Sequence, residues 1–269
     1  MKISFIGGGN MARALIGGLI AQGRKPGDIG VVEPDADKRK QLQTEYGIAV
    51  SDQMPGAASA DIVVLAVKPQ QLRDIAIFLG SLLRKQLVIS IAAGIRSRDL
   101  MRWLGGYDAV IRVMPNTPAQ IRSGASALFA ASGVNAEQRA QAETIFSAVG
   151  GTVWLDDEAQ MDAVTAVSGS GPAYVFYFIE AMQQAARELG LTDAQARELS
   201  LQTFLGASQL ARQSAETPDV LRAQVTSKGG TTERALLDME NSGVKAAIVR
   251  ALHAAAERSR ELGDLLGKD

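Results

Sequence analysis

The first 156 residues alternate short apolar runs with amphipathic stretches, and this alternation restricts the chain to few folds. Apolar and mostly β-branched residues stand side by side in the runs, which is typical of strands buried on both faces of a parallel sheet. Strand–helix–strand alternation then predicts a doubly wound α/β sheet. The predicted strands are residues 3–6, 29–32, 62–67, 87–91 and 109–113, with edge strands at 125–129 and 152–155, and the predicted helices are 11–21, 35–46, 70–83 and 136–149.

The pattern changes after residue 156, where strand-like runs nearly vanish and stretches rich in Ala, Leu, Glu and Arg take over. Pro172 at a helix start and Gly190 just past its end have the expected asymmetry. Thr192 or Asp193 is the predicted N-cap of the next helix, 193–214. Further helices are predicted at 233–240 and 244–266. The sequence therefore predicts an α/β domain over residues 1–156 and an all-helical domain over 157–269.

Composition excludes several kinds of chemistry. Lys and Arg total 28 and Asp and Glu total 29, so no basic excess indicates a nucleic-acid or anionic-membrane partner. Cysteine is absent and His253 is the only histidine, which argues against a metal site and a Ser-His-Asp triad. No apolar run approaches the ~20 residues of a membrane span, and the first residues lack a signal-peptide core. We expect a cytoplasmic protein whose chemistry comes from a cofactor, hydroxyls and backbone amides.

A glycine-rich turn follows the first predicted strand. Gly7-Gly8-Gly9-Asn10-Met11-Ala12 fits G-x-G-x-x-A, in which glycines allow a tight turn and let a pyrophosphate approach the backbone. The next helix then presents free N–H groups and the positive end of its dipole. This position favours dinucleotide binding over a plain tight turn.

Other candidate cofactor contacts lie at the ends of later strands. Glu33 ends the second strand, where an acid commonly binds the adenosine ribose and repels a 2′-phosphate, although Lys38, Arg39 and Lys40 follow closely. Ligands of open α/β sheets bind beyond the carboxyl ends of strands. Three segments meet that condition, and each could instead be an ordinary surface turn: Ala66-Val67-Lys68-Pro69-Gln70, Ser90-Ile91-Ala92-Ala93-Gly94 and Met114-Pro115-Asn116-Thr117-Pro118.

The helical half contains two segments rich in hydroxyls and glycines. Residues 166–174 are predicted to form a loop that either binds an anion or lets two helices pack closely. Val225-Thr226-Ser227-Lys228-Gly229-Gly230-Thr231-Thr232 precedes a helix, and its amides and hydroxyls suit a small carboxylate, with helix capping alone as the alternative. His253 is expected to be a packing or surface residue, and residues 156–158 a solvated charge at the domain boundary.

These motifs, in this order, resemble the pyrroline-5-carboxylate reductase family over nearly the whole chain. The resemblance implies an N-terminal Rossmann domain, a C-terminal dimerisation domain, and a homodimer that assembles further, commonly into a decamer. It also implies reduction of Δ1-pyrroline-5-carboxylate to L-proline by hydride transfer from NADPH or NADH, the last step of proline biosynthesis.

The resemblance assigns roles by position. The cofactor residues are Ile6, Gly7, Gly8, Gly9, Asn10, Met11, Glu33, Gln53, Ala66, Val67, Lys68, Pro69, Ala92, Ala93, Gly94 and Asn116. The substrate residues are Val225, Ser227, Gly229, Gly230, Thr231 and Thr232, and Thr232, the catalytic residue, matches the threonine that hydrogen-bonds the ring nitrogen.

Two positions depart from the family pattern. Lys228 replaces the usual proline of the substrate loop, and Gln53 stands where the family has an asparagine near the adenosine. Gln53 and Glu33 together leave the choice between NADPH, the usual donor of the family, and NADH open.

Two other functions require features that differ from this resemblance. A β-hydroxyacid dehydrogenase also joins a Rossmann domain to a helical one, but it places a catalytic lysine on the first long helix of the second domain, and residues 174–189 contain none. A nicotinamide-sensing protein without turnover would have no reason to assemble the 227–232 pocket.

Overall fold

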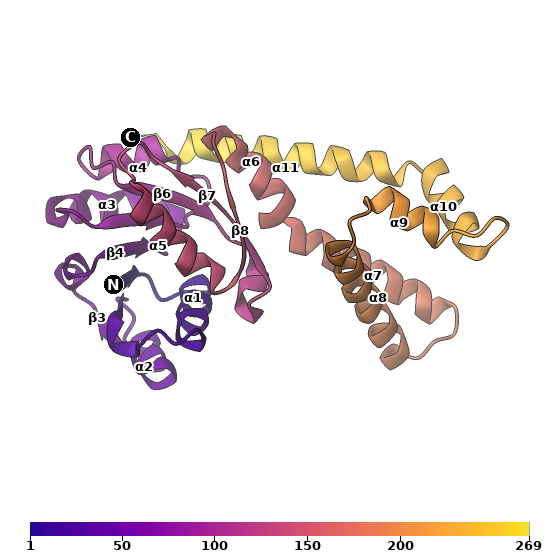
Figure 1. Cartoon of the computed structure of the whole chain (residues 1–269), viewed down its shortest axis with the longest axis horizontal. Helices are drawn as coiled ribbons and strands as arrows, with labels where there is room; N and C mark the ends of the chain where they lie inside the picture. Colours follow the sequence, from indigo (N-terminus) through magenta and orange to yellow (C-terminus); the bar gives the residue numbers. More distant parts are fainter. Residues whose placement is uncertain (269) are drawn as a thin grey trace. The chain divides into compact units, whose positions relative to one another are not determined.

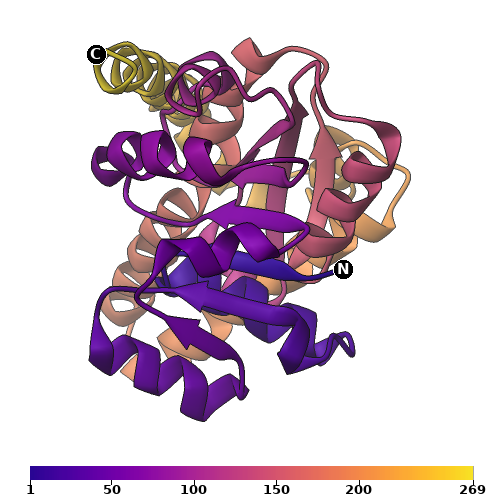
Figure 2. The same cartoon turned by 90° about the vertical axis from the view of Figure 1, so that its left-hand side faces the viewer.

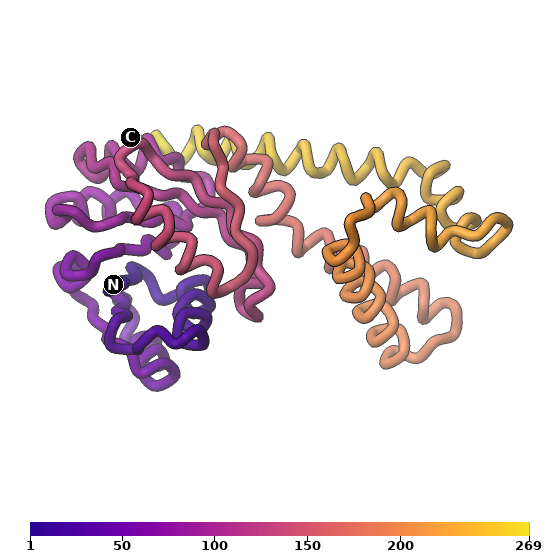
Figure 3. The backbone as a smooth tube through the Cα atoms, in the orientation of Figure 1, coloured from indigo at the N-terminus to yellow at the C-terminus, as the bar shows by residue number. Residues whose placement is uncertain are grey.

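A computed structural model describes residues 1–268, which form two compact units. One unit comprises Met1–Ser170 together with the chain from Ala254 onward, and the other comprises Gly171–His253. The last helix therefore begins in the second unit and ends in the first (Figure 3). The domain boundary after residue 156 stays a prediction of the sequence.

The first unit is built on one eight-stranded sheet (Figures 1 and 2). Its strand order is β3-β2-β1-β4-β5-β6-β7-β8, and every neighbouring pair is parallel except β6 and β7. The predicted doubly wound, mainly parallel sheet is confirmed. Of the two predicted edge strands, β8 lies at an edge, whereas β7 pairs with both β6 and β8, and the opposite edge is β3, which the sequence pattern does not predict. The strands are β1 Ile3–Ile6, β2 Ile29–Val32, β3 Ala49–Ser51, β4 Ile62–Leu65, β5 Leu87–Ser90, β6 Val110–Met114, β7 Gly124–Ala130 and β8 Gly150–Trp154.

Alternate residues of each central strand enter two separate cores, because successive side chains of a strand point to opposite faces. In β4, Ile62 and Val64 join the core that contains side chains of α1, α2 and α5, whereas Val63 and Leu65 join the core under α3 and α4. Helices therefore cover both faces of the sheet. These helices are α1 Asn10–Ala21, α2 Ala36–Tyr46, α3 Pro69–Leu82, α4 Ser97–Trp103 and α5 Ala136–Ser147, with short 3₁₀ turns at Pro26–Asp28, Met54–Ser59, Thr117–Ile121 and Glu158–Gln160.

The remaining elements are helical, as predicted for the second half of the chain. They are α6 Met161–Val164, α7 Gly171–Glu188, α8 Asp193–Gln213, α9 Pro218–Gln224, α10 Thr231–Asn241 and α11 Val244–Leu266. Thr192 is the N-cap of α8 and forms a capping box with Gln195, which decides between the two predicted caps. No helix within residues 1–268 has the length and apolar character needed to cross a bilayer.

The segment between the two units is wound rather than a loop. The sequence predicts a loop over residues 166–174, but α6 runs into a π-helical turn at Thr165–Gly169 and α7 starts at Gly171. The hydroxyls of Thr165 and Ser168 donate to carbonyls four residues earlier. Ser and Thr in such helical segments often bond back to the preceding turn, so these hydroxyls are used within the backbone. The loop prediction is therefore wrong, since these hydroxyls are satisfied without leaving the helical conformation.

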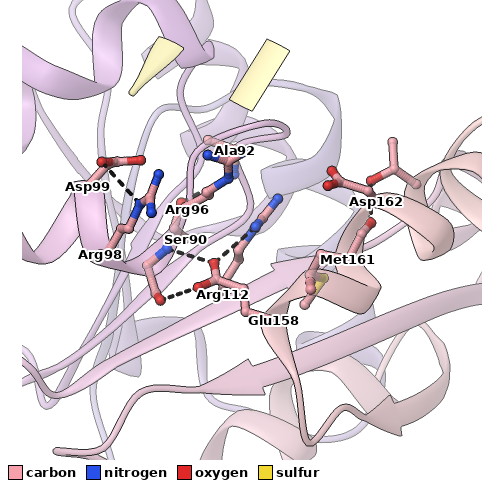
Figure 4. Close-up of polar contacts among 12 residues, drawn as sticks. Ser90, Ala92, Arg96, Arg98, Asp99, Arg112, Glu158, Met161 and Asp162 are labelled. Carbon is pink, nitrogen blue, oxygen red and sulfur yellow. Dashed lines mark hydrogen bonds and ion pairs between the residues drawn. The ribbon is translucent and has the colours of Figure 1, made fainter. Parts of the chain in front are cut away.

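A buried ion pair ties the boundary segment to the sheet (Figure 4). Arg112 lies in β6 with its side chain 7% exposed, and its Nη1 lies 2.9 Å from Oε1 of Glu158. The Glu158 carboxylate also accepts from the backbone N–H of Ser97, at 2.7 Å, and from the Ser97 hydroxyl. The expectation that residues 156–158 are solvated is therefore wrong for Glu158, because it neutralises a buried guanidinium.

Glu158→Gln is expected to lower the free energy of unfolding by about 1–3 kcal/mol, because the amide leaves the buried Arg112 charge without a counterion. Urea unfolding followed by circular dichroism measures the loss. Glu137→Gln, the same change in the exposed first turn of α5, is the control and is expected to cost under ~0.5 kcal/mol. Equal stabilities of the two variants would contradict the structural role of Glu158.

Candidate functional site

The glycine turn joins the central strand β1 to the start of α1. Gly7 has a φ of +98°, which disfavours side chains, and a Cβ at this position would lie 2.6 Å from the Ala66 carbonyl oxygen. Its N–H donates to the Val32 carbonyl at 2.8 Å, so the turn is held between β2 and β4. Gly7 is therefore required by the backbone itself, as the predicted tight turn demands.

The start of α1 is open to an anionic ligand. Gly9 is its N-cap, no side chain caps the first N–H groups, and the first turn contains no acidic residue. A Cβ on Gly9 would meet nothing within 4 Å, and its φ is −72°. Free N–H groups, a positive helix dipole and open space above the backbone are the features that bind a diphosphate. The turn and helix start therefore fit the pyrophosphate of a dinucleotide.

Glu33 reaches back from the end of β2 to the glycine turn. Its Oε2 accepts the Gly8 N–H at 2.9 Å and its Oε1 accepts the Asp35 N–H at 3.1 Å. The residue is 6% exposed. Asp35 in turn caps α2, and its bond from the Lys38 backbone N–H lowers the pKa of the Asp35 carboxyl below its ordinary value. Two carboxylates therefore stand at the end of β2.

Arg39 and Gln53 complete this end of the sheet. The Arg39 guanidinium donates to the carbonyls of Glu33 and Pro34, at 2.7 and 2.8 Å, and lies 3.8 Å from Asp52. The exposed Gln53 side chain donates to Asp52 Oδ1 at 3.1 Å. Contacts within the protein thus orient both side chains, and the part of Gln53 in adenosine binding stays a prediction.

The other predicted cofactor residues follow β4, β5 and β6, whose carboxyl ends share one edge with that of β1 because these strands are parallel. Pro69 begins α3, as predicted, and Lys68 before it is exposed. Gly94 has a φ of +77° and packs against Leu266 of α11. The carboxyl ends of four neighbouring strands therefore share this edge, where Lys68 and Ala93 are exposed and Gly94 is buried.

Asn116 uses its side chain to join two other segments. Its Oδ1 accepts the Ala125 N–H at 2.8 Å and its Nδ2 donates to the Ser168 carbonyl at 3.1 Å. The amide therefore fixes the loop after β6 to β7 and to the π-helical turn. A cofactor contact of Asn116 remains a prediction.

In the second unit, residues 225–230 form a turn between α9 and α10, and Thr231 and Thr232 are the first residues of α10. Gly229 has a φ of +74°, and the Gly230 N–H donates to the Ser227 carbonyl at 3.0 Å. Gly230 is the N-cap of α10 without a capping side chain. Within residues 1–268, the hydroxyls of Ser227, Thr231 and Thr232 have no hydrogen-bond partner. The turn thus presents three free hydroxyls and an uncapped helix start, so these hydroxyls do not serve as caps.

Sequence reasoning missed Glu233, the third residue of α10. Its Oε2 accepts the Gly229 N–H at 2.7 Å. The Glu233 side chain therefore accepts the same backbone N–H that is predicted to bind the substrate carboxylate. The signal was available, because a Glu at the third helical position commonly bonds back toward the helix start.

A pyrroline-5-carboxylate reductase of Pseudomonas aeruginosa is 49% identical over 269 residues, which cover 99% of this chain and 98% of that protein. The chain belongs to the pyrroline-5-carboxylate reductase family. Members of the family from Haemophilus influenzae and Escherichia coli are 41% and 39% identical and cover 98% and 97% of the chain, and 98% of their own lengths. Family membership confirms the resemblance and excludes the β-hydroxyacid dehydrogenase alternative.

Family models and solved structures agree with this membership. A model described as pyrroline-5-carboxylate reductase dimerisation matches residues 158–262, and one described as NADP oxidoreductase, coenzyme F420-dependent, matches residues 2–94. A pyrroline-5-carboxylate reductase structure from Coxiella burnetii is 42% identical, with a TM-score of 0.92, covering 97% of this chain and 98% of its own. A Plasmodium falciparum structure with NADP bound is 28% identical, with a TM-score of 0.88 and 98% coverage of both chains.

Proposed function

We propose that this chain reduces Δ1-pyrroline-5-carboxylate to L-proline with NADPH or NADH, the last step of proline biosynthesis. The observation that carries the proposal is the turn at residues 225–232, where free hydroxyls and amides meet at a helix start. A turn of this kind suits a small carboxylate whose ring nitrogen needs a hydrogen-bond partner. A nucleotide-binding protein without a second ligand has no use for such a turn.

The dinucleotide is assigned to the first unit. The amides of the glycine turn and of the α1 start hold the pyrophosphate, with Ile6, Asn10 and Met11 lining that turn. Glu33 and Gln53 face the adenosine ribose, while the backbones at the ends of β4 and β5 and the Asn116 loop line the remainder. When bound, the nicotinamide supplies the hydride.

The substrate is assigned to the second unit. The substrate carboxylate is bound by Val225, Ser227, Gly229, Gly230 and Thr231. It replaces the Glu233 carboxylate as the acceptor of the Gly229 N–H. Thr232 hydrogen-bonds the ring nitrogen and so fixes which carbon faces the cofactor. Hydride would add to C5 of the protonated C=N bond. The π electron pair of that bond then becomes the lone pair on nitrogen, and the proton already on nitrogen remains as the N–H of the secondary amine of proline.

This chemistry demands positioning more than acid–base catalysis, because an imine is already electrophilic. That agrees with a chain whose only histidine, His253, lies within α11. The experiment is to measure oxidation of NADPH and of NADH in the presence of pyrroline-5-carboxylate, with proline quantified as product. Binding of either nucleotide without substrate-dependent oxidation would instead favour the nicotinamide-sensing alternative.

The proposed assembly is a homodimer that associates into a decamer in the cytoplasm. It is supported by the dimerisation region at 158–262 and by large apolar side chains that α7 and α8 expose. Phe176 is 64% exposed and Tyr177 is 72% exposed. Together with the apolar residues named next they form a group of exposed large side chains, and such groups mark protein–protein interfaces more often than single exposed residues do. The other exposed apolar residues of these two helices are Val175, Met182, Leu199, Leu205 and Leu210.

Phe176→Glu is expected to raise the dissociation constant of the dimer by about 30-fold or more, because a charge would enter an apolar interface. Light scattering after size-exclusion chromatography over a dilution series measures it. Gln43→Glu places the same charge at an exposed polar position of α2, in the first unit, and is expected to leave the mass unchanged. A Phe176→Glu protein with the wild-type mass at every concentration would show that α7 lies outside the interface.

A further inference from the structure

The end of β2 carries an unusual concentration of negative charge for a site that is to hold a nucleotide. We propose that Glu33 makes this chain select NADH over NADPH. The inference rests on the proposed function, since it assigns the choice of nucleotide at that same site. It sets this chain apart from the Plasmodium falciparum relative, whose structure contains NADP.

Glu33 is fixed in the position from which it would act. Both of its carboxylate oxygens accept backbone N–H groups, from Gly8 at 2.9 Å and from Asp35 at 3.1 Å, and the residue is almost fully buried. Hydrogen bonds to an ionised acceptor are among the strong ones in proteins. The carboxylate therefore cannot swing aside for a second anion without leaving both amides unpaired.

Its location puts it beside the ribose of a dinucleotide held by the glycine turn. Gly8 belongs to that turn, and a Cβ on Gly8 would lie 3.3 Å from Glu33 Oε2. In this fold an acid at the end of the second strand accepts hydrogen bonds from the ribose 2′-hydroxyl. The same oxygen repels a 2′-phosphate, because like charges brought together at a binding surface are strongly unfavourable.

The neighbouring cations do not offset this repulsion. The Arg39 guanidinium donates hydrogen bonds to the Glu33 and Pro34 carbonyls and lies near Asp52. It is therefore engaged within the protein and not directed at a phosphate. Lys38 and Lys40 are exposed on α2. Asp35, Asp37 and Asp52 add three further carboxylates around the same strand ends, so acids outnumber bases here.

The test is to measure the equilibrium binding of NADH and of NADPH. Binding is detected by the fluorescence of the reduced nicotinamide and by the shift in melting temperature. The full-length protein is compared with Glu33→Gln, which removes the charge and keeps an oxygen acceptor for the Gly8 N–H. Glu33→Ser is a second, shorter neutral variant in case Gln disturbs the turn. Glu137→Gln, the same change in the exposed first turn of α5, is the control.

We expect the wild type and Glu137→Gln to bind NADH at least about tenfold more tightly than NADPH, and Glu33→Gln to bring the two dissociation constants within about threefold by gaining NADPH affinity. Equal or tighter binding of NADPH by the wild type would overturn the inference and leave the proposed function standing. Discrimination that persists in both Glu33 variants would also overturn it. If the wild type binds neither nucleotide, the proposed function fails, and the inference with it.

Discussion

Gly9→Ala is expected to weaken dinucleotide binding by about 100-fold while leaving the fold as stable as the wild type. Gly9, the second glycine of the G-x-G-x-x-A motif, has an ordinary φ of −72°, and a Cβ at this position would meet no atom of the protein within 4 Å. The methyl group therefore clashes with no atom of the folded chain. It instead occupies the space through which a pyrophosphate must approach the free N–H groups of α1.

Titration with NADH and NADPH gives the loss of affinity, and thermal unfolding without nucleotide checks the fold. Gly27→Ala is the matched control, since a Cβ there also meets nothing and its φ is likewise outside the left-handed region, but it lies in the turn before β2. We expect its affinity and melting temperature to match the wild type. Unchanged affinity in Gly9→Ala would show that the pyrophosphate lies elsewhere, whatever the nucleotide preference.

The elements that sequence patterns predicted best are those whose signal is local and whose burial is complete. All four residues of β4 are fully buried, and an unbroken apolar run is the signature of such a strand. By contrast, β3 has only three residues, none of them buried, and α4 has seven residues with charged side chains among them. Neither segment has a clear hydrophobic periodicity in its sequence. Their secondary structure therefore depends on tertiary contacts that the sequence pattern does not show.

For the candidate site, the sequence indicated the segments but not their internal contacts. The φ of Gly7 and the uncapped start of α1 follow from the glycine motif, because the chain near it is continuous. The bond from Gly8 to Glu33 spans 25 residues, and the ion pair of Arg112 with Glu158 spans 46. Such pairings depend on strand order, and no local pattern encodes it.

Thr232→Ala is expected to reduce kcat by about 10²–10³-fold, the scale observed when one positioned hydrogen-bonding group is removed from an active site. Thr232 is the second residue of α10, and its hydroxyl is without a partner among the described residues, so it is free for a ligand. Alanine is a better helix former, and the residue is only partly buried, so the melting temperature should change little.

Steady-state kinetics with pyrroline-5-carboxylate and direct titration with reduced nucleotide separate the two sites. If Thr232 orients the ring nitrogen, the alanine variant loses turnover and keeps the wild-type nucleotide affinity, because the nucleotide is assigned to the other unit. Thr232→Ser, which retains the hydroxyl, should recover most of the rate, whereas a requirement for the methyl group alone would leave serine as slow as alanine. Full activity of Thr232→Ala would remove this residue from the mechanism, and a parallel loss of nucleotide affinity would mean that it contacts the cofactor instead of the imine.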